Sequence, residues 1–472
     1  MAMTRRRYLA TMVAAAGMGV GKAGRAAANR GTGMAKRDRF GGWTGKTFEA
    51  TGFFRTEHDG TRWWFVTPEG NAFISLGVNH YHKNMWTQDY NRAHWVKAFG
   101  ATRPYDRAWV DGYHKAAAAD CQRLGLNSLG IHTDESLLAP PHGPFLPYVR
   151  RYEPVDLTHY RNPKPENFVD VFDPAFVARC DAAAREMAEP FAADPMVLGY
   201  CMSDLPIFSD TWARYQRSTT WPRRLRNLSG DTPGKKAYML CIRGRYADVA
   251  AFNAAYGTTF ATWNKLAEAR DWRPDTDFAS RSELEDNRAF LLICVDKYYS
   301  VAKAALRRVD ANHLFFGDKL NANGDCLETV VEVTSRYTDV ISFQYYARWK
   351  DQEALLDRIT AKAKKPFLNG DSSYAVPTEM APAPHGTYHD KMRAKDQAER
   401  AAWTRDFCEG LFGRPDGVGW HMCGVIETWK TMKGKEKAQH TGIMTPTGEF
   451  FPEMEAAIQD VSARLYEIAT GD

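Results

Sequence analysis

The chain has 472 residues, of which 13% are aromatic and 25% charged, so it is long enough to bury one large hydrophobic core. Its formal net charge of +5 belongs to the leader, because residues 1–28 carry five Lys or Arg residues and no acid. The rest of the chain is neutral, which gives no electrostatic basis for nucleic-acid binding. No later segment is long and apolar enough for a membrane helix, so we expect no membrane insertion.

The leader resembles a twin-arginine export signal. Arg5-Arg6-Arg7 precedes a short apolar run, and Ala26-Ala27-Ala28 supplies a small-residue cleavage site. We therefore predict a signal peptide over residues 1–28, a flexible Gly-, Arg- and Lys-rich segment over residues 29–45, and a protein exported to the periplasm or beyond the cell.

A β-hairpin is predicted next. Two strand-like segments, 53–55 and 61–66, flank the Asp59-Gly60 turn signal. Eight apolar segments then alternate with helical ones, which favours a closed parallel (β/α)8 barrel over an open sheet. No G-x-G-x-x-G motif follows the first segment, which argues against a dinucleotide-binding fold. The eight predicted strands lie within residues 72–81, 127–132, 148–154, 195–204, 313–319, 339–346, 366–371 and 417–427.

One connection is much longer than the others. Residues 208–285 follow the fourth predicted strand and contain helical patterns, so we predict a helical insertion there. The whole of residues 46–472 is otherwise expected to form a single barrel domain, and nothing in the pattern indicates an oligomeric state.

Cysteine and metal-ligand spacing exclude several classes of protein. The eight cysteines form no C-x-x-C pair, and several lie in apolar strand- or helix-like context, so we expect mostly free, buried thiols. No H-E-x-x-H or other tight ligand spacing appears, and we expect neither metal nor cofactor.

Two acids occupy comparable positions at strand ends. Asp204 ends the fourth predicted strand and Asp371 the seventh. In a (β/α)8 barrel these ends meet at one mouth, and paired carboxylates are the usual machinery of glycoside hydrolysis. Either acid alone is equally well explained as the N-cap of the following helix.

Polar and aromatic side chains end most of the other strands. We expect Trp420, Tyr346 and Trp429 to stack on sugar rings, because an aromatic face covers the apolar face of a pyranose. Several others are expected to hydrogen-bond to sugar hydroxyls, although any single histidine also fits a structural role. These hydroxyl-binding candidates are Asn79, His80, His132, Lys319 and Gln344, and Glu427 is a reserve acid.

Several fragments resemble agarase-type glycoside hydrolases, family 50 and relatives, of the retaining (β/α)8 clan A. The similarity covers roughly residues 48–462, and the opening segment carries its most specific part. It implies a barrel with a helical insertion, a polysaccharide substrate such as an algal galactan, an acid/base after strand four and a nucleophile after strand seven. The matching fragments are 51–54, 63–70, 73–79, 246–266 and Gly419-Trp420-His421.

The chain departs from that family at both acids. Ser203-Asp204-Leu205-Pro206 stands where the family has an Asn-Glu-Leu-Pro-like segment, and Gly370-Asp371 stands where it has Gly-Glu. Each shorter side chain withdraws its carboxylate, so a retaining separation of about 5–5.5 Å is expected to widen to roughly 8 Å, in the inverting range. For these roles Asp204 needs a raised pKa, and Asp371 needs hydrogen bonds or a cation such as Lys319 to stay ionised.

Three functions compete at this point. A glycoside hydrolase is favoured by the acid pair, with Asp204 as general acid and Asp371 as the opposing base or nucleophile. A polysaccharide lyase on the same barrel would use histidine, tyrosine or lysine as acid and base. A catalytically inactive carbohydrate-binding protein is the third, since a shared fold does not guarantee chemistry.

Overall fold

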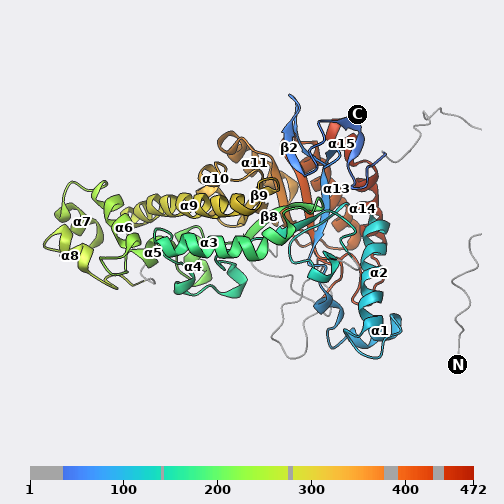
Figure 1. Cartoon of the computed structure of the whole chain (residues 1–472), viewed down its shortest axis with the longest axis horizontal. Coiled ribbons are helices and arrows are strands. Elements are labelled where there is room, and N and C mark those ends of the chain that lie inside the picture. The colour runs from blue at the N-terminus through green and yellow to red at the C-terminus, as the bar shows by residue number, and fades with distance from the viewer. Residues whose placement is uncertain (1–35, 140–142, 275–279, 377–391, 429–440, 472) are drawn as a thin grey trace, which may run out of the picture. The chain divides into compact units, whose positions relative to one another are not determined.

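The computed structural model describes residues 36–139, 143–274, 280–376, 392–428 and 441–471 (Figure 1). The predicted signal peptide over residues 1–28 and the predicted platform residue Trp429 lie outside the described residues. In the described part, no helix combines the length and apolar character that crossing a membrane requires.

A closed barrel of eight parallel strands forms the core of the domain, as predicted. β12 pairs with β5, which closes the sheet, and Trp420 aligns with Leu76 across that seam. Because the strands are buried on both faces, they appear in the sequence as apolar runs rather than as alternating patterns. The barrel strands are β5 (Ser75–Asn79), β6 (Ser128–Leu129), β7 (Tyr148–Arg151), β8 (Val197–Asp204), β9 (Leu314–Asn321), β10 (Ile341–Gln344), β11 (Phe367–Ser372) and β12 (Gly417–Cys423).

Helices surround this barrel (Figure 1). Polar caps fix several of their starts, as where Asp106 accepts a hydrogen bond from the Trp109 backbone and begins α2. The helices outside the insertion are α1 (Arg92–Ala98), α2 (Arg107–Leu124), α3 (Pro174–Met187), α9 (Arg281–Val309), α10 (Cys326–Thr334), α11 (Trp349–Ala363), α13 (Gln397–Gly413), α14 (Pro452–Ala463) and α15 (Leu465–Thr470). Short 3-10 helices lie at Lys83–Trp86, Glu135–Leu137, His159–Arg161, Pro165–Asn167 and Glu189–Phe191.

The predicted insertion after the fourth barrel strand is helical. Its helices pack against the first half of α9. There the buried acids Glu283 and Asp286 form ion pairs with arginines of the insertion. The far half of α9 packs against the barrel wall, and Tyr152 Oη donates to the Ala302 carbonyl over 2.9 Å. The insertion consists of α4 (Asp210–Gln216), α5 (Trp221–Leu225), α6 (Pro233–Arg243), α7 (Val249–Tyr256) and α8 (Trp263–Glu268).

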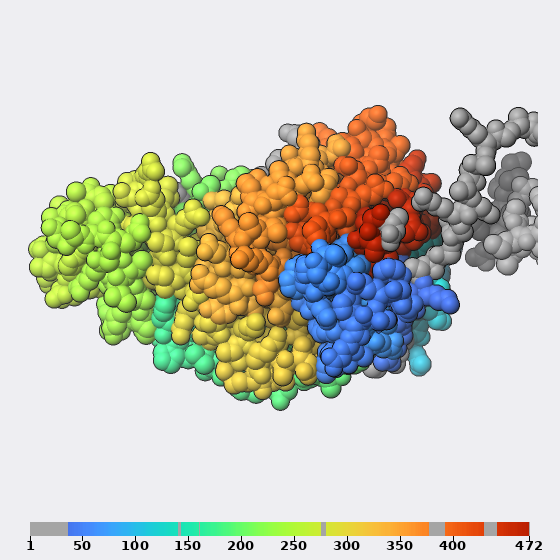
Figure 2. All heavy atoms as spheres, turned by 90° about the horizontal axis from the view of Figure 1, so that it is seen from above, coloured from blue at the N-terminus to red at the C-terminus, as the bar shows by residue number. Residues whose placement is uncertain are grey.

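An antiparallel four-stranded sheet precedes the barrel, in the order β1-β4-β3-β2. The predicted hairpin is confirmed as β2 (Arg55–His58) paired with β3 (Trp63–Val66). Figure 2 shows this N-terminal region, in blue, beside the C-terminal elements, in red. The contact is specific, because the Arg62 guanidinium donates to the Gly417 carbonyl over 2.9 Å. The other two strands are β1 (Trp43–Thr47) and β4 (Asn71–Phe73).

Two segments differ from the sequence-based expectation. Residues 36–45, predicted to be flexible, hold the start of β1, and Phe40 is only 1% exposed. Burial of Phe40 outweighs the Gly- and Arg-rich composition. The second predicted strand, residues 127–132, shortens to β6. Asn127 is still held to Leu76, because its N donates to the Leu76 carbonyl over 3.0 Å and its Oδ1 accepts from Leu76 N over 2.8 Å, while the positive φ of His132 interrupts the extended backbone at the other end.

None of the eight cysteines, all of which lie in the described part, forms a disulfide, and all but Cys241 are buried. The chain's core is therefore held by packing rather than by cross-links, in line with the expectation from cysteine spacing.

Candidate active site

Lys319 joins the two predicted acids at the mouth of the barrel. It lies near the end of β9, and its Nζ is 2.9 Å from Asp204 Oδ1 and 2.6 Å from Asp371 Oδ2. All three side chains are at most 7% exposed. The structure thus brings Asp204 and Asp371 together through Lys319, and of the two acids Asp204 is the one that lines the cavity described below.

Two histidines flank the acids, one on each side. His132 Nε2 lies 2.9 Å from Asp204 Oδ2, and His80 Nε2 lies 3.8 Å from Asp371 Oδ2. The two imidazole rings stack on each other with centroids 4.7 Å apart. The five side chains therefore form a closed ring of ionisable groups, in which each acid contacts one histidine and the shared lysine.

The backbone around this ring is in an unusual conformation. His80, His132 and Leu205 have φ values of 55°, 62° and 57°, in the left-handed region that non-glycine residues rarely adopt. Such strain persists only where the surroundings enforce it, and it clusters at functional sites. Here it turns the chain directly after β5, at His80, and directly after β8, next to Asp204, and it turns the loop after β6 at His132.

The buried side chain of Asp318 fixes the backbone behind the ring. Asp318 Oδ1 accepts a hydrogen bond from the backbone N of Ser203 over 2.8 Å. Ser203 directly precedes Asp204 in the chain, and Asp318 directly precedes Lys319. Burial raises the pKa of Asp318 to about 7. Because successive side chains of a strand point to opposite faces, Asp318 lies behind the strand that presents Lys319 to the two acids.

Tyr346 and Cys423 complete the surroundings of Asp371. Tyr346 Oη donates to Asp371 Oδ1 over 3.1 Å, so this ring serves the acid rather than a sugar face. His80, Asp371 and Cys423 also bring a nitrogen, an oxygen and a sulfur within 4.8 Å of one another, a donor set that suits zinc. An ion there has to compete with Lys319, because Lys319 and His80 approach the same oxygen of Asp371.

The charge state of Asp204 corrects one expectation. Burial alone raises the pKa of Asp204, but the Lys319 ammonium and the His132 hydrogen bond outweigh it and hold that pKa well below its usual range. The raised pKa expected for a general acid is therefore wrong for this state of the protein. Asp371 behaves as expected: Lys319 and His80 overcome its burial and keep it ionised.

The separation of the acids corrects a second expectation. Their nearest oxygens lie 2.9 and 2.6 Å from one nitrogen, and because these distances sum to 5.5 Å, the oxygens cannot be farther apart than that. The expected widening to roughly 8 Å is absent between these oxygens, whose separation does not exceed that of retaining enzymes. The shorter side chains are compensated because Lys319 draws both carboxylates inward.

Other predicted site residues are placed less favourably for substrate contact. Trp420 is 2% exposed, packs edge-on against Phe407 and donates to Ser372 Oγ over 3.0 Å, so it is not an open stacking platform. Asn79 is fully buried, and its Nδ2 donates to the Gly370 carbonyl over 2.6 Å, which supports the strand that carries Asp371. Gln344 and Glu427 are 6% and 4% exposed.

Replacing Trp420 by Phe is expected to destabilise the protein by about 1–3 kcal/mol, through the lost hydrogen bond and the smaller ring. KM is expected to be unchanged, because the indole does not face the cavity. Urea unfolding and steady-state kinetics of the same preparation check both points. A raised KM at unchanged stability would return Trp420 to the substrate surface.

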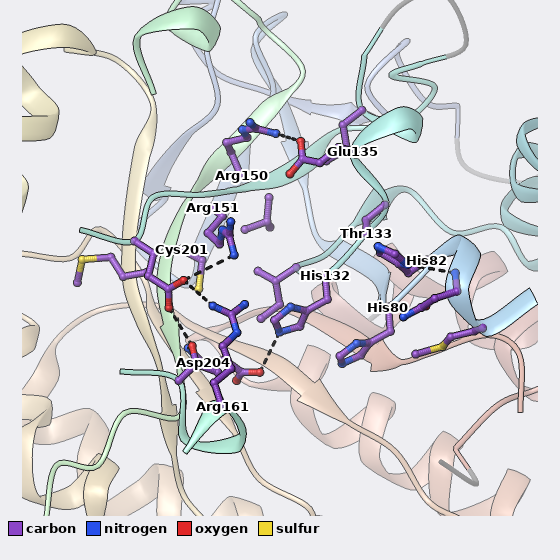
Figure 3. Close-up of a pocket in the computed structure, with 18 residues that line it drawn as sticks. His80, His82, His132, Thr133, Glu135, Arg150, Arg151, Arg161, Cys201 and Asp204 are labelled. Atoms are coloured by element: carbon purple, nitrogen blue, oxygen red, sulfur yellow. Dashed lines mark hydrogen bonds and ion pairs between the residues drawn. The ribbon is translucent and has the colours of Figure 1, made fainter. Parts of the chain in front are cut away.

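A cavity of about 380 Å³ opens beside the ring and is shown in Figure 3. His80, His132 and Asp204 line it, together with an arginine-rich wall from the third barrel strand and the loop after it. This wall was not predicted from the sequence, because its residues follow the weakest strand pattern and carry no motif. The residues missed are His82, Glu135, Arg150, Arg151, Glu153, Thr158 and Arg161.

A parallel barrel with carboxylates after its fourth and seventh strands is the arrangement expected of retaining glycoside hydrolases. No protein-family model matches the chain. In sequence it is similar to beta-agarase B of Vibrio sp. (strain JT0107), with 22% identity over 490 residues, which cover 90% of this chain and 49% of that protein. Beta-agarase A of the same strain is 24% identical over 246 residues, 50% of this chain and 23% of its own length.

Solved agarase structures share the fold. An exo-beta-agarase matches with a TM-score of 0.73 at 19% identity, over 92% of this chain and 67% of that one. Another agarase matches with a TM-score of 0.73 at 18% identity, over 92% and 68% of the two chains. The chain is thus agarase-like in fold, and it spans about half the length of the first of the two curated relatives and 23% of the second.

Proposed function

We propose that this chain is a glycoside hydrolase that cleaves a galactan-type polysaccharide, with agarose as the first substrate to test. The observation that carries the proposal is the pair Asp204 and Asp371, whose nearest oxygens lie within 5.5 Å at the barrel mouth. The agarase relatives favour hydrolysis of a galactan over the lyase and the inactive binding protein.

In this proposal Asp371 is the nucleophile. It is ionised and oriented by Lys319 and Tyr346, which a carboxylate needs in order to attack the anomeric carbon. The proton for the leaving oxygen is assigned to the Asp204–His132 pair, because His132 both bonds Asp204 and lines the cavity. Substrate binding excludes water from this pair and changes the balance between Lys319 and Asp204.

The test is a reducing-end assay on agarose and related galactans, followed by proton NMR of the first product. Retention of the anomeric configuration is expected from the spacing of the acids. An unsaturated product that absorbs in the ultraviolet would indicate elimination instead. Substrate that stays intact across the panel would leave the chain without this activity.

A pH dependence follows from the same assignment. Burial lowers the pKa of His132 to about 4, against the opposing effect of Asp204, so the free protein protonates this pair only in the acid range. Because the protonated pair is the active form, kcat/KM is expected to fall as pH rises above about 4. A pH–rate profile checks this, and a profile that rises from pH 5 to 8 would contradict the assignment.

We further propose that the chain is exported in the folded state through its twin-arginine leader. Replacing Arg5 and Arg6 by Lys is expected to leave precursor in the cytoplasm, as seen by cell fractionation and immunoblotting. A matched Lys22→Arg change, which leaves the arginine pair intact, is expected to export normally. Normal export of the Arg5/Arg6 variant would contradict this route.

A further inference from the structure

Three arginines line the cavity together with His80 and His132 (Figure 3). Arg150 and Arg151 end β7, and Arg161 comes from the 3-10 helix after it. Arg150 is held in place by the ring of Phe191, 3.8 Å from its guanidinium carbon. The wall is therefore built from charged groups with defined positions, one of which is fixed by an aromatic contact.

The acids that pair with these arginines are mostly at the solvent side. Glu135 contacts Arg150 but is 68% exposed, and Asp156 lies 3.1 Å from Arg161 and is 42% exposed. Exposed ion pairs contribute little and exchange readily, so these acids neutralise the wall weakly.

One partner acid of this wall is deeply buried. Glu153, 5% exposed, is shared between Arg161 at 3.1 Å and Arg151 at 3.7 Å. Two guanidinium groups thus converge on a single buried carboxylate. In addition, Arg150 Nε is buried without a hydrogen-bond partner among the described residues. The wall therefore brings three guanidinium groups to the cavity, and two of them share one buried carboxylate.

Guanidinium groups match the planar or tetrahedral oxygens of carboxylates and sulfates with paired hydrogen bonds. A neutral sugar against this wall would remove water from the arginines without supplying a negative charge to pair with them. We infer that the cavity receives an anionic sugar unit, one that carries a sulfate ester or a carboxylate, held by Arg150, Arg151 and Arg161. This inference rests on the proposed function, because it names the substrate class of the same site.

The test measures binding rather than cleavage. Calorimetric titration with galactose 6-sulfate, galacturonate and neutral methyl galactoside is expected to show at least one anionic sugar binding about tenfold or more tightly than the neutral one. Comparing the first two ligands separates a sulfate ester from a carboxylate. Arg151→Gln, at a side chain that is 51% exposed, is expected to remove most of this preference without unfolding the protein.

Arg161→Gln serves as a second variant with the same expected loss. Arg281→Gln is the matched control, because Arg281 pairs with Glu285 on the surface of α9 and is 93% exposed; it is expected to keep the preference. Equal binding of charged and neutral sugars, or a preference that survives both Arg151→Gln and Arg161→Gln, would overturn the inference.

The outcome is separable from that of the proposed function. Hydrolysis of neutral agarose without any preference for anionic sugars would remove the inference and leave the hydrolase intact. Tight binding of an anionic sugar, with no reducing ends released from neutral or sulfated galactans, would keep the anionic-sugar site and remove the hydrolase activity.

Discussion

Asp371→Asn is expected to lower kcat/KM on the cleaved galactan by about 10³-fold or more, because the amide can neither attack the anomeric carbon nor activate water. Asp204→Asn is expected to show a loss of similar order, since the amide cannot share a proton with His132. Steady-state kinetics on purified variants measure both losses.

The matched control is Asp325→Asn, because Asp325 directly precedes α10 and its carboxylate accepts a hydrogen bond from Ser209 Oγ rather than contacting the ring. Its activity is expected to stay within a few-fold of the parent protein. Each variant's thermal unfolding midpoint is recorded alongside, so that lost activity is not mistaken for lost fold. Near-normal activity in either Asp371→Asn or Asp204→Asn would remove that acid from the mechanism.

Lys319→Met is expected to reduce the free energy of unfolding by about 3–5 kcal/mol at neutral pH, because two buried carboxylates lose their common cation. In the parent protein the pKa values of Asp204 and Asp371 are depressed, so both contribute stability above the unfolded value near 4 and lose it as pH falls further. Without Lys319, burial dominates and raises both pKa values.

The variant's stability deficit should therefore shrink as pH is lowered from 7.5 toward 4.5, where the acids take up protons. Urea unfolding at these two pH values measures the change. Lys265→Met is the matched control, since Lys265 forms an exposed pair with Glu268 and its loss is expected to cost less than about 1 kcal/mol. A deficit that is equal at both pH values would show that lost packing, not charge, sets the cost.

The barrel was predictable because its signal is repeated. Buried parallel strands appear as short apolar runs between helical patterns, and a misjudged end of one run does not change the pattern of the other seven. The second strand illustrates this: only Ser128–Leu129 forms β6, yet the side chain of Asn127 maintains the link to Leu76. The positions of Asp204 and Asp371 were predictable for the same reason, because each acid ends one of these apolar runs.

The electrostatics of the site were not predictable from the pattern. Lys319 reaches both acids because the strand register shifts between Cys201 and Asp204 on β8, and again beside Asp371 on β11. Register shifts and positive φ values at His80 and His132 leave no mark in an apolar run. Burial of Trp420 was missed for a related reason: a strand-end tryptophan looks the same in sequence whether it faces the mouth or a helix such as α13.

The long helix α9 makes the insertion and the barrel depend on each other, because it contacts both. Glu283 is fully buried and is held by Arg226 at 2.5 Å and Arg273 at 2.7 Å, both contributed by the insertion. The same helix continues into the barrel wall. A gene shortened by removing the insertion would leave this acid inside the protein with no counter-charge. Trimming the protein to a minimal barrel, in evolution or by engineering, therefore requires a compensating change at Glu283 in the same step.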